Sequence, residues 1–272
     1  MALPFVFSDA GLLAVQAGVV AAPRALAPLR SLHSRGWALV PIASIVGVVF
    51  MIRYASGSAN WLTYLALVAV PILAAVALGW LAHGARPPLA LAAIALFVIV
   101  WRTPGSLVGG AAEAILSGLS CVTLGVLLAA VTPSGWLKFG ILAMAGADVW
   151  LVSSDLLQHP NSVLEAAAPG GGLPQLQSER FGVVTMGYGD LFVAGLLGAI
   201  YAGRPRLQVA AALLTFAFAC LFDMLFFVIS ELPATVPVAL AMLALEIGPV
   251  RSFFSAARYP WMRAAATPPR AT

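Results

Sequence analysis

Long apolar runs separated by short polar connections dominate the pattern of hydrophobic and polar positions along this chain. A helix needs about 20 apolar residues to span a bilayer, and somewhat fewer where flanking side chains reach the interface. Nine segments meet this criterion, at residues 3–22, 37–52, 61–82, 88–101, 107–131, 136–154, 181–203, 207–230 and 233–250. We therefore expect an all-α polytopic membrane protein with nine transmembrane helices.

The overall composition agrees with this expectation. Hydrophobic residues make up 62% of the 272-residue chain and charged residues only 9%, and the mean hydropathy is +1.00. These values lie far from those of a soluble domain. No basic segment precedes the first apolar run, so we expect no cleaved signal peptide. The expected location is a prokaryotic cell membrane, with the protein as a multi-pass component of the lipid bilayer.

The basic residues indicate the orientation of the chain, because Lys and Arg gather in cytoplasmic loops. With the N-terminus outside and the C-terminus cytoplasmic, three basic residues lie outside: Arg53, Arg102 and Arg180. The other 11 lie inside: Arg24, Arg30, Arg35, Arg86, Lys138, Arg204, Arg206, Arg251, Arg258, Arg263 and Arg270. Topology thus accounts for the net charge of +4, and no basic stripe for nucleic acid is evident.

We expect one membrane domain with two parts. Residues 1–131 would form a scaffold of five helices, and residues 132–272 would carry the candidate chemistry on helices six, seven and nine. The long connection at 155–180 contains a Pro-Gly-Gly-Gly run, and we expect it to be mobile.

Two aspartates interrupt these apolar segments, Asp148 in the sixth and Asp190 in the seventh. A carboxylate at membrane depth is costly unless it faces a partner or a polar cavity, and it therefore indicates function. A helical rise of about 1.5 Å per residue places them about 10 Å and about 15 Å below the outer surface. Two carboxyl groups that meet there would share a proton. One could take a proton from water while the other hydrogen-bonds an amide carbonyl.

Asp223 is an alternative partner for Asp190, because it lies at a similar expected depth. It could instead be a structural acid bonded to a neighbouring helix. We favour Asp148, whose segment directly precedes that of Asp190 in the chain. Glu113 and Glu246 sit near segment ends, where a solvated carboxylate costs little, and we expect them to be mainly structural.

Three short motifs resemble the signature of the presenilin and signal peptide peptidase family of intramembrane aspartyl proteases. That family has nine spans and carries Tyr-Asp, Gly-x-Gly-Asp and Pro-Ala-Leu motifs in this order. The matching residues lie between positions 136 and 250, and they are Asp148, Gly187, Tyr188, Gly189, Asp190, Pro233, Ala234 and Thr235. Two positions depart from the pattern, because Ala147 stands in place of tyrosine and Thr235 in place of leucine. A second register for the last motif starts at Pro237.

The resemblance implies an aspartic endopeptidase that hydrolyses peptide bonds of transmembrane or signal-peptide helices. Asp148 and Asp190 would be catalytic, and the other motif residues would support the active site or bind substrate. The outside N-terminus resembles the signal peptide peptidase branch, which implies substrates with a cytoplasmic N-terminus. The connection at 155–180 and the region around Pro233 would hold the unwound substrate as an added β-strand. No cofactor, nucleic acid or accessory subunit is implied.

The glycines of the Gly-x-Gly-Asp motif also have a mechanical interpretation. Glycine has no side-chain bulk, so Gly187 and Gly189 would let a neighbouring helix or a substrate backbone approach the acid closely. We expect the whole motif to lie inside one helix over 181–203.

Other function classes compete for the same residues. The run from Thr185 to Asp190 resembles a potassium-channel filter, although no pore helix is evident before it. Prepilin peptidases share the Gly-x-Gly-Asp motif but carry a lysine where this chain has Phe192, and they place further spans between the two acids. A proton-coupled transporter would show two related halves, which this sequence lacks. We find no metal-ligand spacing around the histidines and no Gly-x-Ser-x-Gly run.

Overall fold

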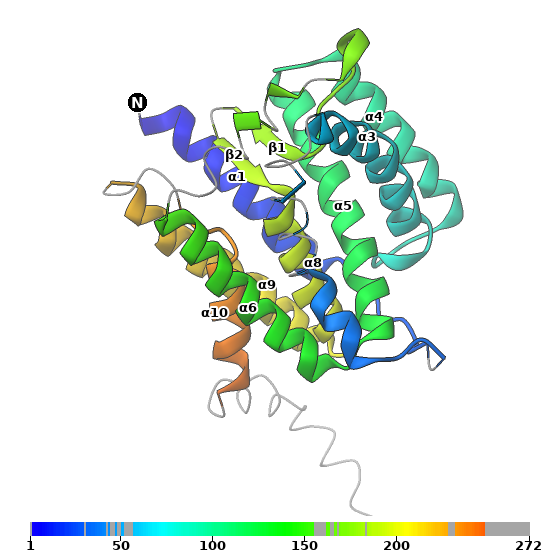
Figure 1. Ribbon diagram of the computed structural model, residues 1–272, viewed down its shortest axis with the longest axis vertical. Helices are drawn as coiled ribbons and strands as arrows, with labels where there is room; N and C mark the ends of the chain where they lie inside the picture. The colour runs from blue at the N-terminus through cyan, green and yellow to red at the C-terminus, as the bar shows by residue number, and fades with distance from the viewer. Residues whose placement is uncertain are drawn as a thin grey trace, which may run out of the picture.

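A computed structural model describes residues 2–29, 31–41, 43, 47, 50–51, 57–154, 162–163, 166–167, 169–182, 184–227 and 232–247. The described chain is mostly helical, with one small β-hairpin at one end of the bundle (Figure 1). The helices are α1 (Ala2–Ala21), α3 (Ser58–Val76), α4 (Leu91–Arg102), α5 (Leu107–Val131), α6 (Ser134–Ser153), α8 (Tyr188–Tyr201), α9 (Pro205–Asp223) and α10 (Val236–Glu246). Short helical turns extend some of them, at Ala77–Leu81, Pro87–Ala90 and Met224–Phe227, and others form at Arg35–Leu39 and Gly170–Gly172.

Most predicted segments coincide with a helix. Helix α5 has the predicted bounds, and α10 is shorter than the predicted ninth segment, because it starts at Val236 and ends at Glu246. Much of the second segment, at 37–52, lies outside the described residues, as do positions 155–161 of the long connection.

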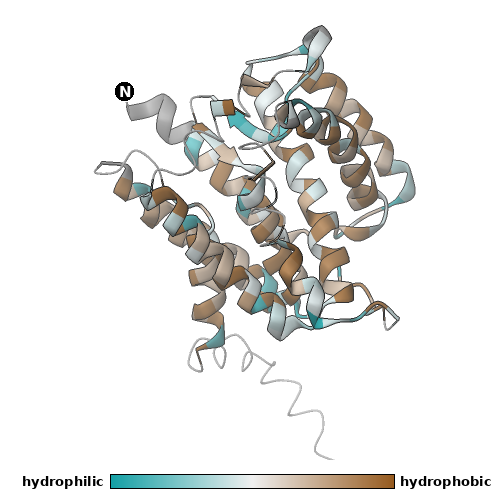
Figure 2. Ribbon diagram, viewed as in Figure 1, coloured by the Kyte–Doolittle hydropathy of each residue, from teal (hydrophilic) through white to brown (hydrophobic). Residues whose placement is uncertain are grey.

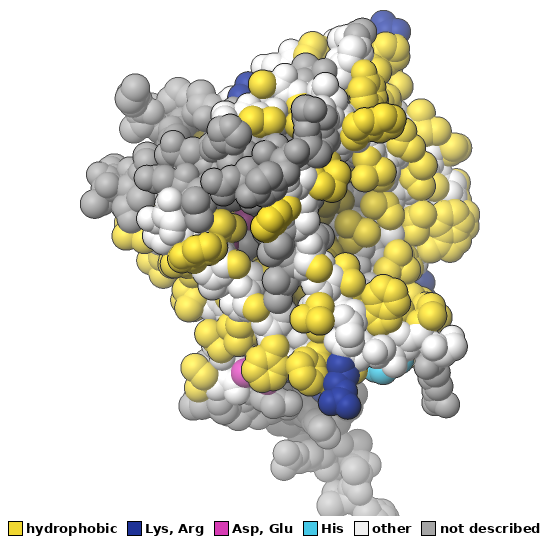
Figure 3. Space-filling model, in the orientation of Figure 1, with side chains coloured by type: hydrophobic (Ala, Val, Ile, Leu, Met, Phe, Trp, Pro, Cys, Tyr) yellow, Lys and Arg dark blue, Asp and Glu magenta, His cyan; other side chains and the backbone are white. Residues whose placement is uncertain are grey.

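Four helical segments in the described part of the chain are long and apolar enough to cross a membrane: Ala59–Leu81, Leu107–Val131, Ser134–Ser153 and Pro205–Asp223. Large apolar side chains cover wide areas of the surface (Figure 3). On α3, for example, Trp61 is 77% exposed and Leu65 is 63% exposed. A soluble protein rarely shows so much contiguous apolar surface, whereas lipid chains would cover it.

The predicted helix over 181–203 is wrong in its first part. Residues Ser178–Phe181 form strand β1 and Val184–Gly187 form strand β2, paired antiparallel with Glu179 opposite Met186. The turn uses Gly182 at a φ of +62°, a conformation that glycine adopts easily. The Gly-x-Gly-Asp motif therefore spans the junction of β2 and α8, and the helical-rise estimate for the depth of Asp190 does not apply.

Helix α8 lies at the centre of the bundle and packs against α5, α1, α6 and α9 (Figure 1). Glycine permits the close contact between α5 and α8. A Cβ added at Gly195 of α8 would lie 2.5 Å from the carbonyl oxygen of Cys121, and one added at Gly125 would lie 2.5 Å from the backbone of Gly195. Small residues let two helix backbones approach in this way.

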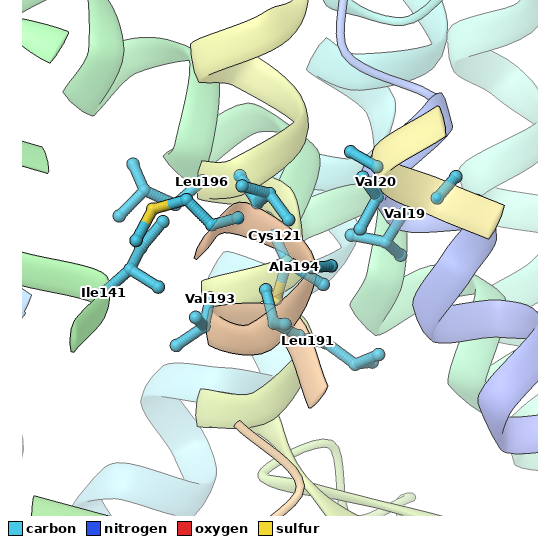
Figure 4. Packing of buried hydrophobic residues seen from close by; sticks show 14 of the residues in the cluster. Val19, Val20, Cys121, Ile141, Leu191, Val193, Ala194 and Leu196 are labelled. Carbon is cyan, nitrogen blue, oxygen red and sulfur yellow. The ribbon is translucent and has the colours of Figure 1, made fainter. Parts of the chain in front are cut away.

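One continuous apolar core joins the two predicted parts of the chain. Figure 4 shows side chains from α1, α5, α6 and α8 meeting around Cys121, Leu191 and Leu196. Teal residues concentrate at the hairpin and at the helix ends, whereas most of each helix is brown (Figure 2). Helices α1 and α5 of the first part thus share an apolar core with the aspartate-bearing helices α6 and α8, while α3 and α4 pack on α5 in a second cluster.

Of the three helices that carry the motifs, α6 runs opposite to α8 and α10. At the end of the bundle away from the hairpin, Lys138 near the start of α6 forms a 2.6 Å ion pair with Glu246 at the end of α10. The same carboxylate accepts a hydrogen bond of 2.8 Å from Tyr201 at the end of α8. The end of α6 therefore lies beside the starts of α8 and α10, where the three motifs meet.

Candidate active site

Asp148 lies five residues before the end of α6, and the residue beside it is Thr235. The Thr235 hydroxyl donates a hydrogen bond of 2.6 Å to Oδ2 of Asp148, and the Thr235 backbone N–H donates to the same oxygen at 3.3 Å. Thr235 is buried, with 4% of its surface exposed. The residue that departs from the family's Pro-Ala-Leu pattern is thus the one that contacts the first aspartate.

Asp190 lies in the first turn of α8. Its Oδ2 accepts a hydrogen bond of 3.1 Å from the backbone N–H of Gly187, which closes the helix N-terminus as a capping acid does. This bond fixes the carboxyl group against the end of β2. Asp190 therefore caps the N-terminus of α8. The same hydrogen bond orients its carboxyl group toward the cavity described below.

The carboxyl groups of Asp148 and Asp190 are close enough to interact electrostatically, although they come from different helices. Asp223, the alternative partner, interacts instead with Asp9 of α1. The structure therefore places Asp148 within electrostatic range of Asp190, and Asp223 within range of Asp9.

A cavity of about 90 Å³ opens beside Asp190. Its volume corresponds to a few water molecules. Strand β2, the segment before α10, and helices α1 and α9 contribute to its wall. The lining residues that matter here are Asp190, the three β2 residues Val184, Thr185 and Met186, and the run Leu232, Pro233 and Ala234. Asp148 does not line the cavity and is joined to its wall through Thr235, the residue after Ala234.

Helix α1 holds the Pro-Ala segment in place. The side chain of Gln16 donates a hydrogen bond of 3.0 Å to the carbonyl oxygen of Ala234. Pro233 and Ala234 precede α10 and line the cavity, and so does Pro237, with which the alternative register begins, whereas Val238 and Ala239 are buried within α10. Thr235, which bonds Asp148, belongs to the register that begins at Pro233.

The motif glycines do not act as expected toward a neighbouring helix. A Cβ added at Gly187 would lie 3.2 Å from Oδ2 of Asp190, and one added at Gly189 would meet no atom within 4 Å. Close helix approach depends instead on Gly125 and Gly195. At position 187, the absence of a side chain leaves room for the carboxyl group of Asp190.

Tyr188 points away from the cavity. Its hydroxyl is 2.7 Å from the Ser120 hydroxyl of α5, and the Cys121 thiol donates to its carbonyl oxygen at 3.7 Å. These contacts anchor the start of α8 on α5. Tyr188 is not among the described residues that line the cavity, and its role is to hold the start of α8 against α5.

Glu179 of β1 is a buried acid that the sequence reasoning missed. Its side chain is fully buried, and neither carboxyl oxygen has a hydrogen-bond partner among the described residues. Burial raises the pKa of Glu179 well above its usual range. The nearby Ser117 hydroxyl opposes the rise only partly, while Glu113 and Asp190 reinforce it. Burial thus favours the neutral form of Glu179, and its carboxyl group is close enough to that of Asp190 for the two to interact electrostatically.

Comparison with protein-family models, with curated proteins and with solved structures gives no match.

On the expectation from the motifs that the two acids cleave transmembrane peptides, replacing Thr235 with valine should reduce kcat/KM by about ten- to a hundredfold, because a hydrogen bond to a charged group contributes roughly 1.5–3 kcal/mol. Valine keeps the shape of the side chain and the backbone bond to Asp148 but removes the hydroxyl. Thr235→Ser keeps the hydroxyl and is the matched control. Equal rates for the wild type and Thr235→Val, or equal losses in both variants, would show that this bond has no catalytic role.

Replacing Glu179 with glutamine should remove a pH-dependent loss of stability. The raised pKa means that the folded protein holds a proton that the unfolded chain releases above about pH 4.3. Stability should therefore fall as pH rises from there toward the folded-state pKa, by at most about 1.4 kcal/mol per pH unit. Thermal unfolding in detergent at pH 5 and pH 8 measures this. We expect Glu179→Gln to raise the melting temperature at pH 8 more than at pH 5, and a pH-independent difference would contradict the argument.

Proposed function

We propose that this protein is an intramembrane aspartyl protease of the presenilin and signal peptide peptidase type, with nine spans and an outside N-terminus. The observation that carries the proposal is the meeting of Asp148 and Asp190 beside a cavity lined by the Pro-Ala segment. The Thr235 contact joins the first and third motifs, which are 87 positions apart in the chain. Large exposed apolar surfaces support a membrane location.

The chemistry is hydrolysis of an amide by one acid pair. The ionised carboxylate takes a proton from water while the water oxygen attacks the amide carbon, and the neutral carboxyl group hydrogen-bonds the carbonyl oxygen. The acid pair then passes a proton to the amide nitrogen as the C–N bond breaks. Because the two groups titrate as a unit, the roles belong to the pair and not to one residue.

Strand β2 supplies a place for the substrate backbone. Among the described strands it pairs only with β1, and Val184, Thr185 and Met186 line the cavity. A transmembrane helix hides its amides in its own hydrogen bonds and must unwind before attack. An unwound segment can pair with the second edge of β2, a mode in which main-chain hydrogen bonds supply the affinity.

The direct test is cleavage of a transmembrane peptide, with its N-terminus on the cytoplasmic side, by the purified protein in liposomes. We expect two product peptides by mass spectrometry, and inhibition by a peptide that carries a central hydroxyl in place of the scissile amide. The same liposomes should show no potassium flux. Potassium flux without cleavage would favour the channel alternative, and proton-coupled uptake without cleavage would favour a carrier.

A further inference from the structure

The cavity beside Asp190 follows strand β2. Three consecutive residues of that strand line it, Val184, Thr185 and Met186. A strand rises by about 3.3 Å per residue, so the cavity accompanies β2 for about 7 Å. A substrate segment that pairs with the second edge of β2 would therefore run along this cavity, which Asp190 also lines.

The geometry of a paired strand determines which substrate residue meets the cavity. Successive side chains of a strand point to opposite faces, so only every second side chain is directed toward one face, at intervals of about 7 Å. Asp190 has to reach the amide that is cleaved, and it lines the same cavity. The side chain that enters the cavity therefore belongs to a residue that adjoins the scissile bond.

The wall opposite β2 is largely apolar. Leu13 of α1 and Ala219 of α9 are buried, with 5% and 2% of their surfaces exposed, and Phe222 of α9 lines the cavity beside them. The two acids of this wall, Asp9 and Asp223, are hydrogen-bonded to each other. Because each acid already has a partner, this wall does not require a charged side chain from the substrate. Size is then the property by which the cavity selects.

The volume of the cavity sets the limit on size. It measures about 90 Å³. An apolar cavity of about 150 Å³ in a protein core binds a benzene molecule, and one water molecule occupies about 30 Å³ in the liquid. The cavity is therefore too small for a phenyl ring, but it has room for the few carbon atoms of an alanine or valine side chain.

We propose that this cavity is the subsite for the substrate side chain that adjoins the scissile bond, and that it admits side chains up to the size of valine and excludes aromatic ones. This inference rests on the proposed function, because it names the substrate residue that the same cavity selects. Two residues of α9 set the limit. Phe222 fills part of the space with its ring, and Ala219 leaves space free because its side chain is a single methyl group.

The test uses a transmembrane peptide in which one residue at a time, through its central region, is alanine, valine or phenylalanine. We measure kcat/KM on the wild type and binding on the Asp148→Asn variant, which prevents turnover and leaves the cavity lining unchanged. At one of the two residues that flank the scissile bond, phenylalanine should lower both quantities by about ten- to a hundredfold relative to alanine, the usual effect of a misfit in an apolar pocket. Valine should lower them by less than about threefold.

Two variants shift this limit in opposite directions. Phe222→Ala enlarges the cavity, so the loss with the phenylalanine peptide should fall below about threefold. Ala219→Val fills part of the cavity, so the valine peptide should then lose about tenfold as well. The matched controls are Leu221→Ala and Ala217→Val, which make the same kinds of change at exposed positions of α9 outside the cavity lining. Both controls should keep the wild-type preference.

Equal binding of the alanine and phenylalanine peptides at every position would overturn the inference, even if both peptides are cleaved. An unchanged phenylalanine loss in folded Phe222→Ala would overturn it too, as would an unchanged valine peptide in folded Ala219→Val. A size preference in binding without any cleavage by the wild type would support the subsite and contradict the proposed protease activity. The two claims therefore fail separately.

Discussion

Replacing Asp190 with asparagine should reduce cleavage of a transmembrane peptide by at least about a thousandfold, the loss expected when one member of an acid–base pair is removed. Asparagine has nearly the same shape and can still accept the Gly187 N–H through its carbonyl oxygen, so the cap of α8 is kept. It cannot take a proton from water. The comparison of cleavage rates therefore tests the chemistry and not the fold.

Asp148→Asn should show a similar loss, because neither acid works without the other. Its control is Glu246→Gln, which removes a carboxylate at the other end of the bundle and should leave the cleavage rate within a few-fold of the wild type. Melting temperatures and elution volumes in detergent show whether each variant is folded. Full activity in a folded Asp190→Asn or Asp148→Asn protein would remove that residue from the mechanism.

Replacing Gly195 with alanine should destabilise the protein by about 1–3 kcal/mol, the usual cost of inserting a carbon into a well-packed interface. The added Cβ would lie 2.5 Å from the carbonyl oxygen of Cys121, so α5 and α8 would have to separate. Because α8 carries Asp190 and lies in the centre of the core, the change should lower both the melting temperature and the activity.

Gly146→Ala in α6 is the matched control, since a Cβ at that position meets no atom within 4 Å. Alanine is the better helix former, so this variant should be as stable as the wild type or slightly more so. A melting temperature for Gly195→Ala equal to that of Gly146→Ala would show that the two helices can separate at little cost.

The lengths of the apolar runs were enough to predict most of the helices. Helix α5, for example, has its predicted bounds at Leu107 and Val131, because a polar capping residue and a turn flank an uninterrupted apolar run. The sequence pattern did not predict the hairpin, because no polar residues separate it from the helix that follows. The apolar residues of β2 adjoin those of α8 without a polar break, and only Gly182 and Gly187 on either side of Val184 and Thr185 indicate a strand.

The short motifs predicted the two aspartates of the site but not the side chains that contact them. The spacing of Asp148 and Asp190 indicated a pair, but the contact between Asp148 and Thr235 depends on tertiary packing that no local pattern encodes. Asp9 and Gln16 are seven positions apart in an apolar helix, which places them on one face and could have been noticed. No pattern in the sequence indicates that Glu179 is buried, because its burial depends on strand β1, which the sequence did not predict.

The central claim is that residues 148 and 190 act as one unit, and affinity for a hydroxyl-containing transition-state mimic tests it most directly. Binding can be measured in the wild type, in Asp148→Asn, in Asp190→Asn and in the double variant, even where cleavage is absent. We predict that each single change weakens binding strongly and that the double change weakens it little further, as for groups that work together. Losses that simply add, or a mimic that binds all four proteins equally, would contradict the account.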